Sequence, residues 1–263
     1  MNSINKWLSC LLVCLPVLML AQQQLYKEAS LVKGTDTLNY RILWPDNFSE
    51  DQVYPLVLFL HGAGERGSDN EAQLIHGSSL FAAVENRAEF PAIVIFPQCP
   101  RDDYWSNVDV DRSGEGVKLE FHPEKTPTTA LSLVMELLSE QLDKSYVDKD
   151  RVYVAGLSMG GMGTFEILGR MPQTFAAAIP ICGGGSDDLV EKYAQVPMWV
   201  FHGAKDDVVN PLYSLEMVEA LLEAGGYPNF TLYENARHNS WDSAFAEPEF
   251  LPWLFSKTRT PKN

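Results

Sequence analysis

The sequence predicts an α/β fold with a doubly wound, mostly parallel sheet and helices on both faces. Apolar strand-like runs alternate with helix-like segments along the chain, which is typical of parallel strands joined by crossover helices. From residue 54 onward most of these runs are almost continuously apolar, as expected for strands buried on both faces. One of them ends in a glycine-rich turn that leads directly into a helical segment, at residues 152–170.

The first two strands, at 29–34 and 37–45, are expected to form an antiparallel start to the sheet. The later strand candidates are 54–62, 92–98, 151–158, 176–183, 197–203 and 229–236. Helical segments separate them at 70–87, 127–145, after Ser158, and at 211–226. An active site in such a sheet lies at the carboxyl ends of the strands.

The chain is expected to form one catalytic domain over residues 22–263. Its 263 residues are 46% hydrophobic, which is enough for one sizeable core, and no repeat or Pro/Gly/Ser linker divides them. About a dozen residues connect the strands at 176–183 and 197–203, too few for a large helical cap. We therefore expect an open site.

Residues 1–21 have the layout of a secretory signal peptide. Lys6 precedes an apolar run from Trp7 to Ala21, and glutamines follow. The run is shorter than the ~20 residues that span a bilayer. We expect cleavage after Ala21 and a secreted or periplasmic protein with no stable membrane insertion. Lipid anchoring through Cys10 or Cys14 is not expected, because an acylated cysteine follows small residues and only Ser9 before Cys10 fits this pattern.

The charge balance excludes some partners. A formal net charge of −15 at pH 7 disfavours nucleic acids and anionic membranes. No cofactor or metal is predicted, because no His/Cys cluster has metal-ligand spacing and no glycine loop resembles a phosphate cradle. Cys99 and Cys182 follow different strands and are expected to remain separate thiols.

The motif G-x-S-x-G places Ser158 between Gly156 and Gly160. In isolation this pattern is often only a turn. Here it joins a strand to a helix, which is the context of a nucleophile elbow, a turn so sharp that small residues must flank the serine. The sequence therefore predicts Ser158 as a catalytic nucleophile.

The order of residues along the chain indicates the partners of Ser158. In this arrangement an acid follows the serine after a later strand, and a histidine comes near the C-terminus. Asp206 and Asp207 leave the strand at 197–203, and Asp206 is favoured as the acid. His238 is then the general base, because His202 lies within the segment that supplies the acid. For His202 and His61, each followed by a glycine, a structural role at the turn is expected.

The oxyanion hole requires two backbone amides. The residue after the nucleophile, Met159, should supply one. The other should come from the loop after the strand at 54–62, where small residues let the backbone approach a substrate oxygen. Ala63 is predicted as this second donor.

Five segments together resemble a known family: FLHGAGERGSDN, FPQCP, GLSMGGMGTFE, FHGAKDDVV and RHNSWDSAF. They are similar to α/β-hydrolase esterases related to feruloyl esterases and polyhydroxybutyrate depolymerases, many of them labelled predicted peptidases of the prolyl oligopeptidase type. The resemblance implies an α/β-hydrolase fold and assigns Ser158, Asp206 and His238 to the family's catalytic triad. The doubled aspartate departs from the pattern and leaves Asp207 as the alternative acid.

The expected function is therefore that of an exported serine carboxylesterase, acting on small-molecule or polysaccharide-linked esters such as feruloyl or acetyl groups. A long polar loop after the strand at 92–98 carries Tyr104 and Trp105 toward the site, and Trp105 is expected to be an exposed substrate-binding aromatic. Two alternatives remain: a serine peptidase of prolyl oligopeptidase type, and a non-catalytic binding module. The sequence gives no oligomeric state.

Overall fold

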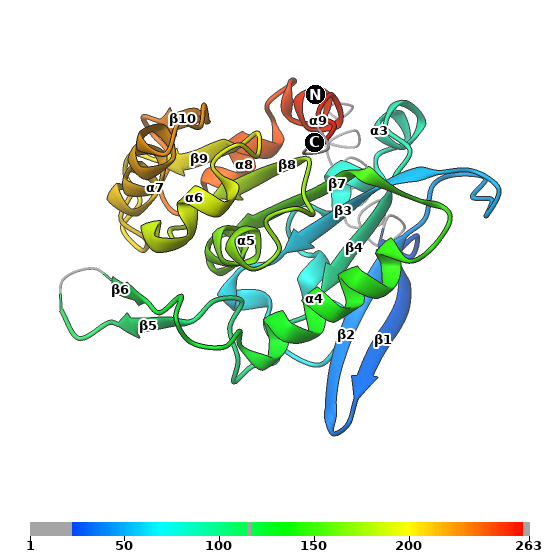
Figure 1. Ribbon diagram of the computed structural model, residues 1–263, viewed down its shortest axis with the longest axis horizontal. Helices are drawn as coiled ribbons and strands as arrows, with labels where there is room; N and C mark the ends of the chain where they lie inside the picture. Colours follow the sequence, from blue (N-terminus) through cyan, green and yellow to red (C-terminus); the bar gives the residue numbers. More distant parts are fainter. Residues whose placement is uncertain (1–22, 115–116, 260–263) are drawn as a thin grey trace, which may run out of the picture.

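A twisted eight-stranded sheet forms the centre of the molecule (Figure 1). The computed structural model describes residues 23–114 and 117–259. The spatial order of the strands is β1-β2-β4-β3-β7-β8-β9-β10. Their bounds are β1 Lys27–Lys33, β2 Asp36–Leu43, β3 Tyr54–Leu60, β4 Ile93–Pro97, β7 Val147–Leu157, β8 Ala177–Ile181, β9 Trp199–Gly203 and β10 Asn229–Tyr233. Strand β2 is antiparallel to both neighbours and the other pairs are parallel, which confirms the predicted antiparallel start and parallel remainder.

Helices cover both faces of the sheet and create two hydrophobic cores. Their bounds are α2 Ser78–Ala82, α3 Val84–Glu89, α4 Thr129–Leu142, α5 Met159–Arg170, α6 Val190–Tyr193, α7 Leu212–Glu223, α8 Ser240–Phe245 and α9 Phe250–Phe255. Apolar side chains of α4, α5, α6 and α7 share one core, whereas those of α2, α8 and α9 share the other. All residues of β3 and β4 are consequently buried, which explains why these strands are continuously apolar.

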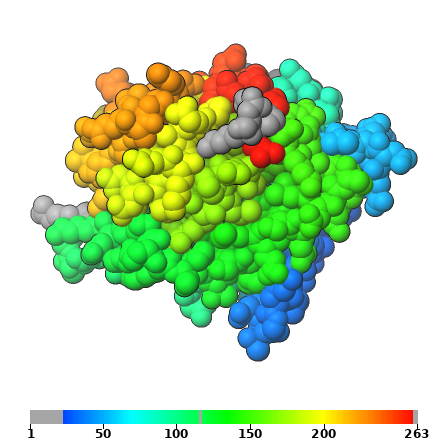
Figure 2. Space-filling model, viewed as in Figure 1, coloured from blue at the N-terminus to red at the C-terminus, as the bar shows by residue number. Residues whose placement is uncertain are grey.

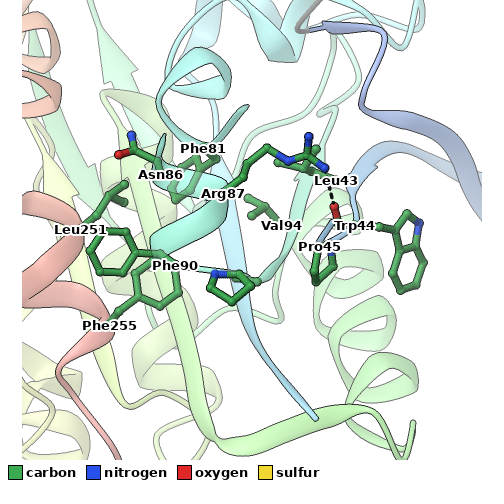
Figure 3. A pocket seen from close by; sticks show the side chains of 12 residues that line it. Leu43, Trp44, Pro45, Phe81, Asn86, Arg87, Phe90, Val94, Leu251 and Phe255 are labelled. Atoms are coloured by element: carbon green, nitrogen blue, oxygen red, sulfur yellow. Dashed lines mark hydrogen bonds between the residues drawn. The ribbon is translucent and has the colours of Figure 1, made fainter. Parts of the chain in front are cut away.

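A small recess lies where α3 and α9 meet the N-terminal part of the sheet (Figure 3). Phe90 stacks on Phe255 with ring centroids 5.2 Å apart, and Arg87 donates a hydrogen bond to the Trp44 carbonyl at 3.2 Å. The free volume is only about 10 Å³, which is no more than one water molecule requires. The recess is therefore a feature of packing rather than a ligand site.

Two regions differ from the sequence-based expectation. The single helix predicted over 70–87 is instead a 3₁₀ turn at Ala72–Leu74 followed by α2 and part of α3, because Gly77 adopts a left-handed conformation with φ of +80°. The long loop after β4 contains a hairpin formed by β5 Val108–Asp111 and β6 Lys118–Phe121. This hairpin projects from the body of the molecule next to α7 (Figures 1 and 2).

The hairpin is anchored on α7. The Leu119 N–H donates a hydrogen bond to Tyr213 Oη at 2.9 Å, and the rings of Phe121 and Tyr213 meet edge to face. No helix within residues 23–114 and 117–259 has the length and apolar character needed to cross a membrane. The signal peptide predicted at 1–21 lies outside the described residues. Cys99 and Cys182 are both free, which confirms that they are separate thiols, and both are buried.

Candidate active site

Ser158 lies at the sharp turn between β7 and α5. Its backbone has φ of 54° and ψ of −116°, an uncommon conformation for a residue with a side chain. The turn brings α5 so close to the neighbouring strand that a Cβ atom on Gly160 would lie 1.9 Å from the Leu60 carbonyl oxygen. A Cβ atom on Gly156 would lie 2.3 Å from the Gly160 carbonyl oxygen. Both glycines of the motif are thus required by backbone contacts.

A continuous chain of hydrogen bonds links Ser158, His238 and Asp206. Ser158 Oγ lies 2.9 Å from His238 Nε2, and His238 Nδ1 lies 2.8 Å from Asp206 Oδ2. The serine comes from the β7–α5 turn, the aspartate from the loop after β9, and the histidine from the loop between β10 and α8. These loops meet at the carboxyl ends of the strands because β7, β8, β9 and β10 are successive parallel strands of the sheet.

Asp206 is held as a charged carboxylate. Its Oδ1 atom accepts hydrogen bonds from the N–H groups of Val208 and Val209, each at 2.9 Å. His202 Nε2 lies 3.2 Å from Oδ2, the oxygen that also contacts His238. Burial acts to raise the pKa of Asp206, but the hydrogen bonds from His202 and His238 outweigh it and keep that pKa well below its ordinary value.

Asp207 points away from the imidazole. It is exposed and forms an ion pair with the exposed Arg237, with 2.5 Å between Oδ2 and Nη1. The structure therefore brings Asp206 to His238 and leaves Asp207 on the surface.

Of the two residues predicted to supply oxyanion amides, Ala63 lines the same cavity as Ser158, and Met159 directly follows Ser158 in the chain. Ala63 is the first residue of a 3₁₀ turn, Ala63–Glu65, and Met159 is the first residue of α5. The first N–H groups of a helix have no partner within it, so both are available to a ligand. The loop containing Ala63 and the side chain of Ser158 line the cavity together.

The expectation that Trp105 is an exposed aromatic beside the cleft is wrong. Its side chain is fully buried, and its indole N–H donates a hydrogen bond to the His61 carbonyl at 3.1 Å. A buried indole needs a partner for its N–H, and the backbone of this loop provides one. The neighbouring Tyr104 lines the cavity instead.

The cavity beside Ser158 has a volume of about 230 Å³. Residues of the β5–β6 hairpin form part of its wall, among them Val110, Arg112 and Leu119. Glu65 and His76 also line it, with 3.8 Å between Oε1 and Nε2. The ring centroids of His76 and Trp241 lie 5.1 Å apart, and Trp241 also packs edge to face against His238.

Several residues of this site were not anticipated from the sequence. The sequence predicts only a polar loop where the hairpin lies, since the strands of the hairpin are short and alternate exposed with half-buried residues. Glu65 lies only two residues after Ala63, so its position in the sequence is enough to place it next to the oxyanion loop. His202 was expected to hold a turn, and its contact with Asp206 became visible only in three dimensions.

Cys182, Asp206 and His238 are the one group of possible metal ligands found among residues 23–114 and 117–259. Their ligand atoms lie within 4.8 Å of one another. Burial raises the pKa of the Cys182 thiol well above its ordinary value, so the sulfur is a neutral thiol and a poor ligand. The imidazole and carboxylate already bond to each other. This chemistry suits proton transfer better than metal binding.

Comparison with known proteins places the fold among esterases. A thermostable esterase of known structure is 35% identical, with a TM-score of 0.82 over 91% of this chain and 64% of that chain. A ferulic acid esterase from Anaeromyces mucronatus shares the fold with a TM-score of 0.59 and 15% identity, over 88% of this chain and 90% of that chain. Among curated proteins, a bifunctional acetylxylan esterase/xylanase from Neocallimastix patriciarum is 36% identical over 72 residues, or 27% of this chain and 11% of that protein.

The chain spans only 11% to 26% of the length of the first three curated relatives. A family model described as phospholipase/carboxylesterase matches residues 48–249, which include Ser158, Asp206 and His238. Since this match covers most of the chain and agrees with the mostly parallel sheet flanked by helices, the protein belongs to the phospholipase/carboxylesterase family and has the α/β-hydrolase fold.

Proposed function

We propose that this protein is an exported serine carboxylesterase. The observation that carries the proposal is the hydrogen-bonded chain from Ser158 Oγ through the His238 ring to Asp206 Oδ2, with successive distances of 2.9 and 2.8 Å. A serine and a base within hydrogen-bond distance, with the base oriented by a third group, form an arrangement suited to nucleophilic catalysis. The layout of residues 1–21 is the support for export.

The proposed reaction proceeds through an acyl-enzyme. Ser158 Oγ attacks the ester carbonyl carbon while His238 Nε2 accepts its proton, and Asp206 stabilises the imidazolium that forms. The ester C–O bond then breaks as His238 returns the proton to the leaving alcohol. A water molecule, deprotonated by His238, then attacks the acyl carbon. The bond from this carbon to Ser158 Oγ breaks as His238 returns the proton to Oγ, and the carboxylic acid leaves.

The N–H groups of Ala63 and Met159 stabilise the negative oxygen of both tetrahedral intermediates. Donors that are fixed before the reaction need no reorganisation as charge develops, and removing one typically lowers turnover by about 10²–10³-fold.

Esters of plant polysaccharides, such as acetyl or feruloyl esters, are the substrates that we propose. The named relatives include an acetylxylan esterase/xylanase and ferulic acid esterases. The cavity of about 230 Å³ combines apolar hairpin residues with the polar groups of Glu65, His76 and Arg112, which suits a short or aromatic acyl group next to a hydroxylated alcohol. Within residues 23–114 and 117–259 no large helical insertion covers the site, which leaves room for a polymeric alcohol.

Replacement of the nucleophile tests this proposal. Ser158→Ala should lower turnover of p-nitrophenyl acetate by on the order of 10⁶-fold, because the attacking atom is lost. Its melting temperature should stay near that of the wild type. An organophosphonate should label wild-type Ser158 and leave the variant unlabelled, as read by mass spectrometry of peptides. If the variant keeps a tenth of the activity, Ser158 is not the nucleophile.

A panel of acetyl, butyryl, long-chain and feruloyl esters, with a proline-containing peptide amide, tests the substrate class. We expect hydrolysis of acetyl or feruloyl esters and no cleavage of the amide. A preference for long acyl chains would contradict the polysaccharide-ester assignment, and peptide cleavage would favour a peptidase.

A further inference from the structure

Side chains hold three consecutive carbonyl groups of the loop that contains Ala63. Trp105 Nε1 donates to the His61 carbonyl at 3.1 Å, His61 Nδ1 to the Gly62 carbonyl at 2.6 Å, and Arg66 Nε to the Ala63 carbonyl at 3.0 Å. Gly62 O also accepts a longer bond from the Glu65 N–H, at 3.4 Å. The side chains of His61, Trp105 and Arg66 take no part in the proposed chemistry. Each nevertheless fixes one peptide group of the oxyanion loop.

The hydrogen bonds of His61 determine which ring nitrogen carries the proton. The backbone N–H of Cys99 donates to His61 Nε2 at 2.9 Å, so Nε2 is an acceptor. Nδ1 therefore carries the hydrogen and donates it to the Gly62 carbonyl. Burial lowers the pKa of His61 to about 4, so that the ring stays neutral and keeps this tautomer near neutral pH.

The bond from His61 acts on the peptide group that supplies an oxyanion donor. The carbonyl of Gly62 and the N–H of Ala63 belong to one planar peptide unit, so fixing the oxygen also fixes the direction of the N–H. A hydrogen bond to the carbonyl also polarises the unit and strengthens its N–H as a donor.

Trp105 and Arg66 connect this loop to the chain that follows β4. The indole of Trp105 is fully buried and packs edge to face against the His61 ring, with 5.2 Å between centroids. Arg66 also donates to the Asp103 carbonyl at 3.2 Å and lies over the Tyr104 ring. The loop after β3 is thereby tied to residues 99–105, of which Cys99 and Trp105 are buried.

We propose that His61, Trp105 and Arg66 are positioning residues that hold the Gly62–Ala63 peptide in the orientation required of an oxyanion donor. The proposal rests on the proposed function, because it assigns the Ala63 N–H to the oxyanion hole. It gives Trp105 a role through backbone geometry, without contact with substrate.

A pair of matched tryptophan variants tests this role. Trp105→Phe removes the indole N–H that holds the loop. Trp199→Phe is the control, since it removes a similar bond, from Nε1 to Thr231 Oγ1 at 3.0 Å, on β9 and away from the cavity. Rates on p-nitrophenyl acetate are divided by the number of active sites titrated with an organophosphonate, so that unfolded protein does not contribute.

We expect per-site kcat of Trp105→Phe to fall about tenfold with KM nearly unchanged, which is less than the full loss of an oxyanion donor would cost. Trp199→Phe should stay within about twofold of the wild type. Equal kcat values for the two variants, or a change confined to KM, would overturn the role of Trp105. A wild-type protein that neither hydrolyses esters nor reacts with the phosphonate would instead contradict the proposed function itself.

Two variants of His61 separate positioning from packing. Asn places an amide N–H near the position of Nδ1 and can still donate to Gly62 O, whereas Gln reaches the position of Nε2 and loses that donor. Both remove the ring, so a packing role predicts similar kcat values. We expect the Asn variant to keep a per-site kcat at least about fivefold above that of the Gln variant, since misplacement by about 1 Å can cost up to 10²-fold. Equal values would contradict the positioning role, even if Trp105→Phe failed to fold.

Discussion

Adjacent residues Asp206 and Asp207 have opposite environments. Asp206 is buried and accepts bonds from two backbone N–H groups and two imidazoles. Asp207 is exposed and meets only the flexible Arg237 side chain among the described residues. A buried carboxylate can orient an imidazole because its own geometry is fixed, whereas an exposed ion pair is screened by water and contributes about 0–1 kcal/mol.

Asparagine substitutions at these two positions test the assignment of the acid. Asp206→Asn keeps the shape but removes the charge that favours the correct His238 tautomer, and such a change costs about 10⁴-fold in turnover. Asp207→Asn should stay within about fivefold of the wild type, because it disrupts only a surface pair. Turnover of both variants on one activated ester decides between them. If Asp207→Asn instead shows the larger loss of turnover, Asp207 is the acid, and the roles assigned to Ser158 and His238 are unchanged.

Trp105 and His238 show how far the position of a single side chain can be predicted from the sequence. His238 could be selected because chain order left one histidine after the predicted acid. Trp105 could be placed near the site, but an aromatic residue in a polar loop fits exposure and burial equally well. Only the position of the His61 carbonyl, supplied by a distant segment, decides that the indole points inward.

At the scale of elements, the contact between α5 and β3 determines where Ser158 lies. The helix begins directly after β7 and crosses the end of β3 at backbone contact distance, which is possible because Gly160 has no side chain. The elbow and the oxyanion loop are thus packed against each other through their backbones. A shift of α5 would move Met159 relative to Ala63.

Gly160→Ala should therefore destabilise the protein. The added Cβ would lie 1.9 Å from the Leu60 carbonyl oxygen, and neither backbone segment can move without disturbing the sheet. We expect a loss of at least about 3 kcal/mol, or roughly 10 °C in melting temperature. Gly114→Ala is the control, since a Cβ there meets nothing within 4 Å, and its melting temperature should stay within about 2 °C. Similar melting temperatures for the two variants would show that α5 can retreat from β3.

The elements themselves were predictable to different degrees. Buried strands such as β3 and β4 were recognisable because both of their faces require apolar residues. The break at Gly77 was not, since the segment around it has helical spacing and the left-handed turn depends on packing beneath it. The β5–β6 hairpin is not apparent from the sequence, because its strands are short and alternate exposed with half-buried residues, and because its bond from Leu119 to Tyr213 joins residues that lie far apart in the chain.

At the scale of the whole molecule, the sheet brings together loops that lie far apart in sequence. The loops after β3, β7, β9 and β10 supply the oxyanion amide, the nucleophile, the acid and the base of the proposed site. Two cores, one on each face, hold these strands in register. The site therefore depends on the integrity of the complete fold, and global stability is a relevant property of the enzyme.

The burial of His61 links that stability to pH. In the native state burial lowers the pKa of His61 from its ordinary value of 6.5 to about 4, so between these values the unfolded chain binds a proton that the native protein does not. Stability contributed by the neutral ring is complete above about pH 6.5 and is lost as the pH falls toward 4, by about 3 kcal/mol in total. Asp206 does not oppose this trend, because its pKa lies below this range.

The free energy of unfolding in urea, measured at pH 7 and pH 4.5 for the wild type and His61→Asn, provides the test. We expect the variant to be less stable at pH 7 but to lose about 2 kcal/mol less than the wild type on acidification. Parallel losses would mean that the native protein binds a proton on His61 as readily as the unfolded chain does, so that burial does not hold the ring neutral over this pH range.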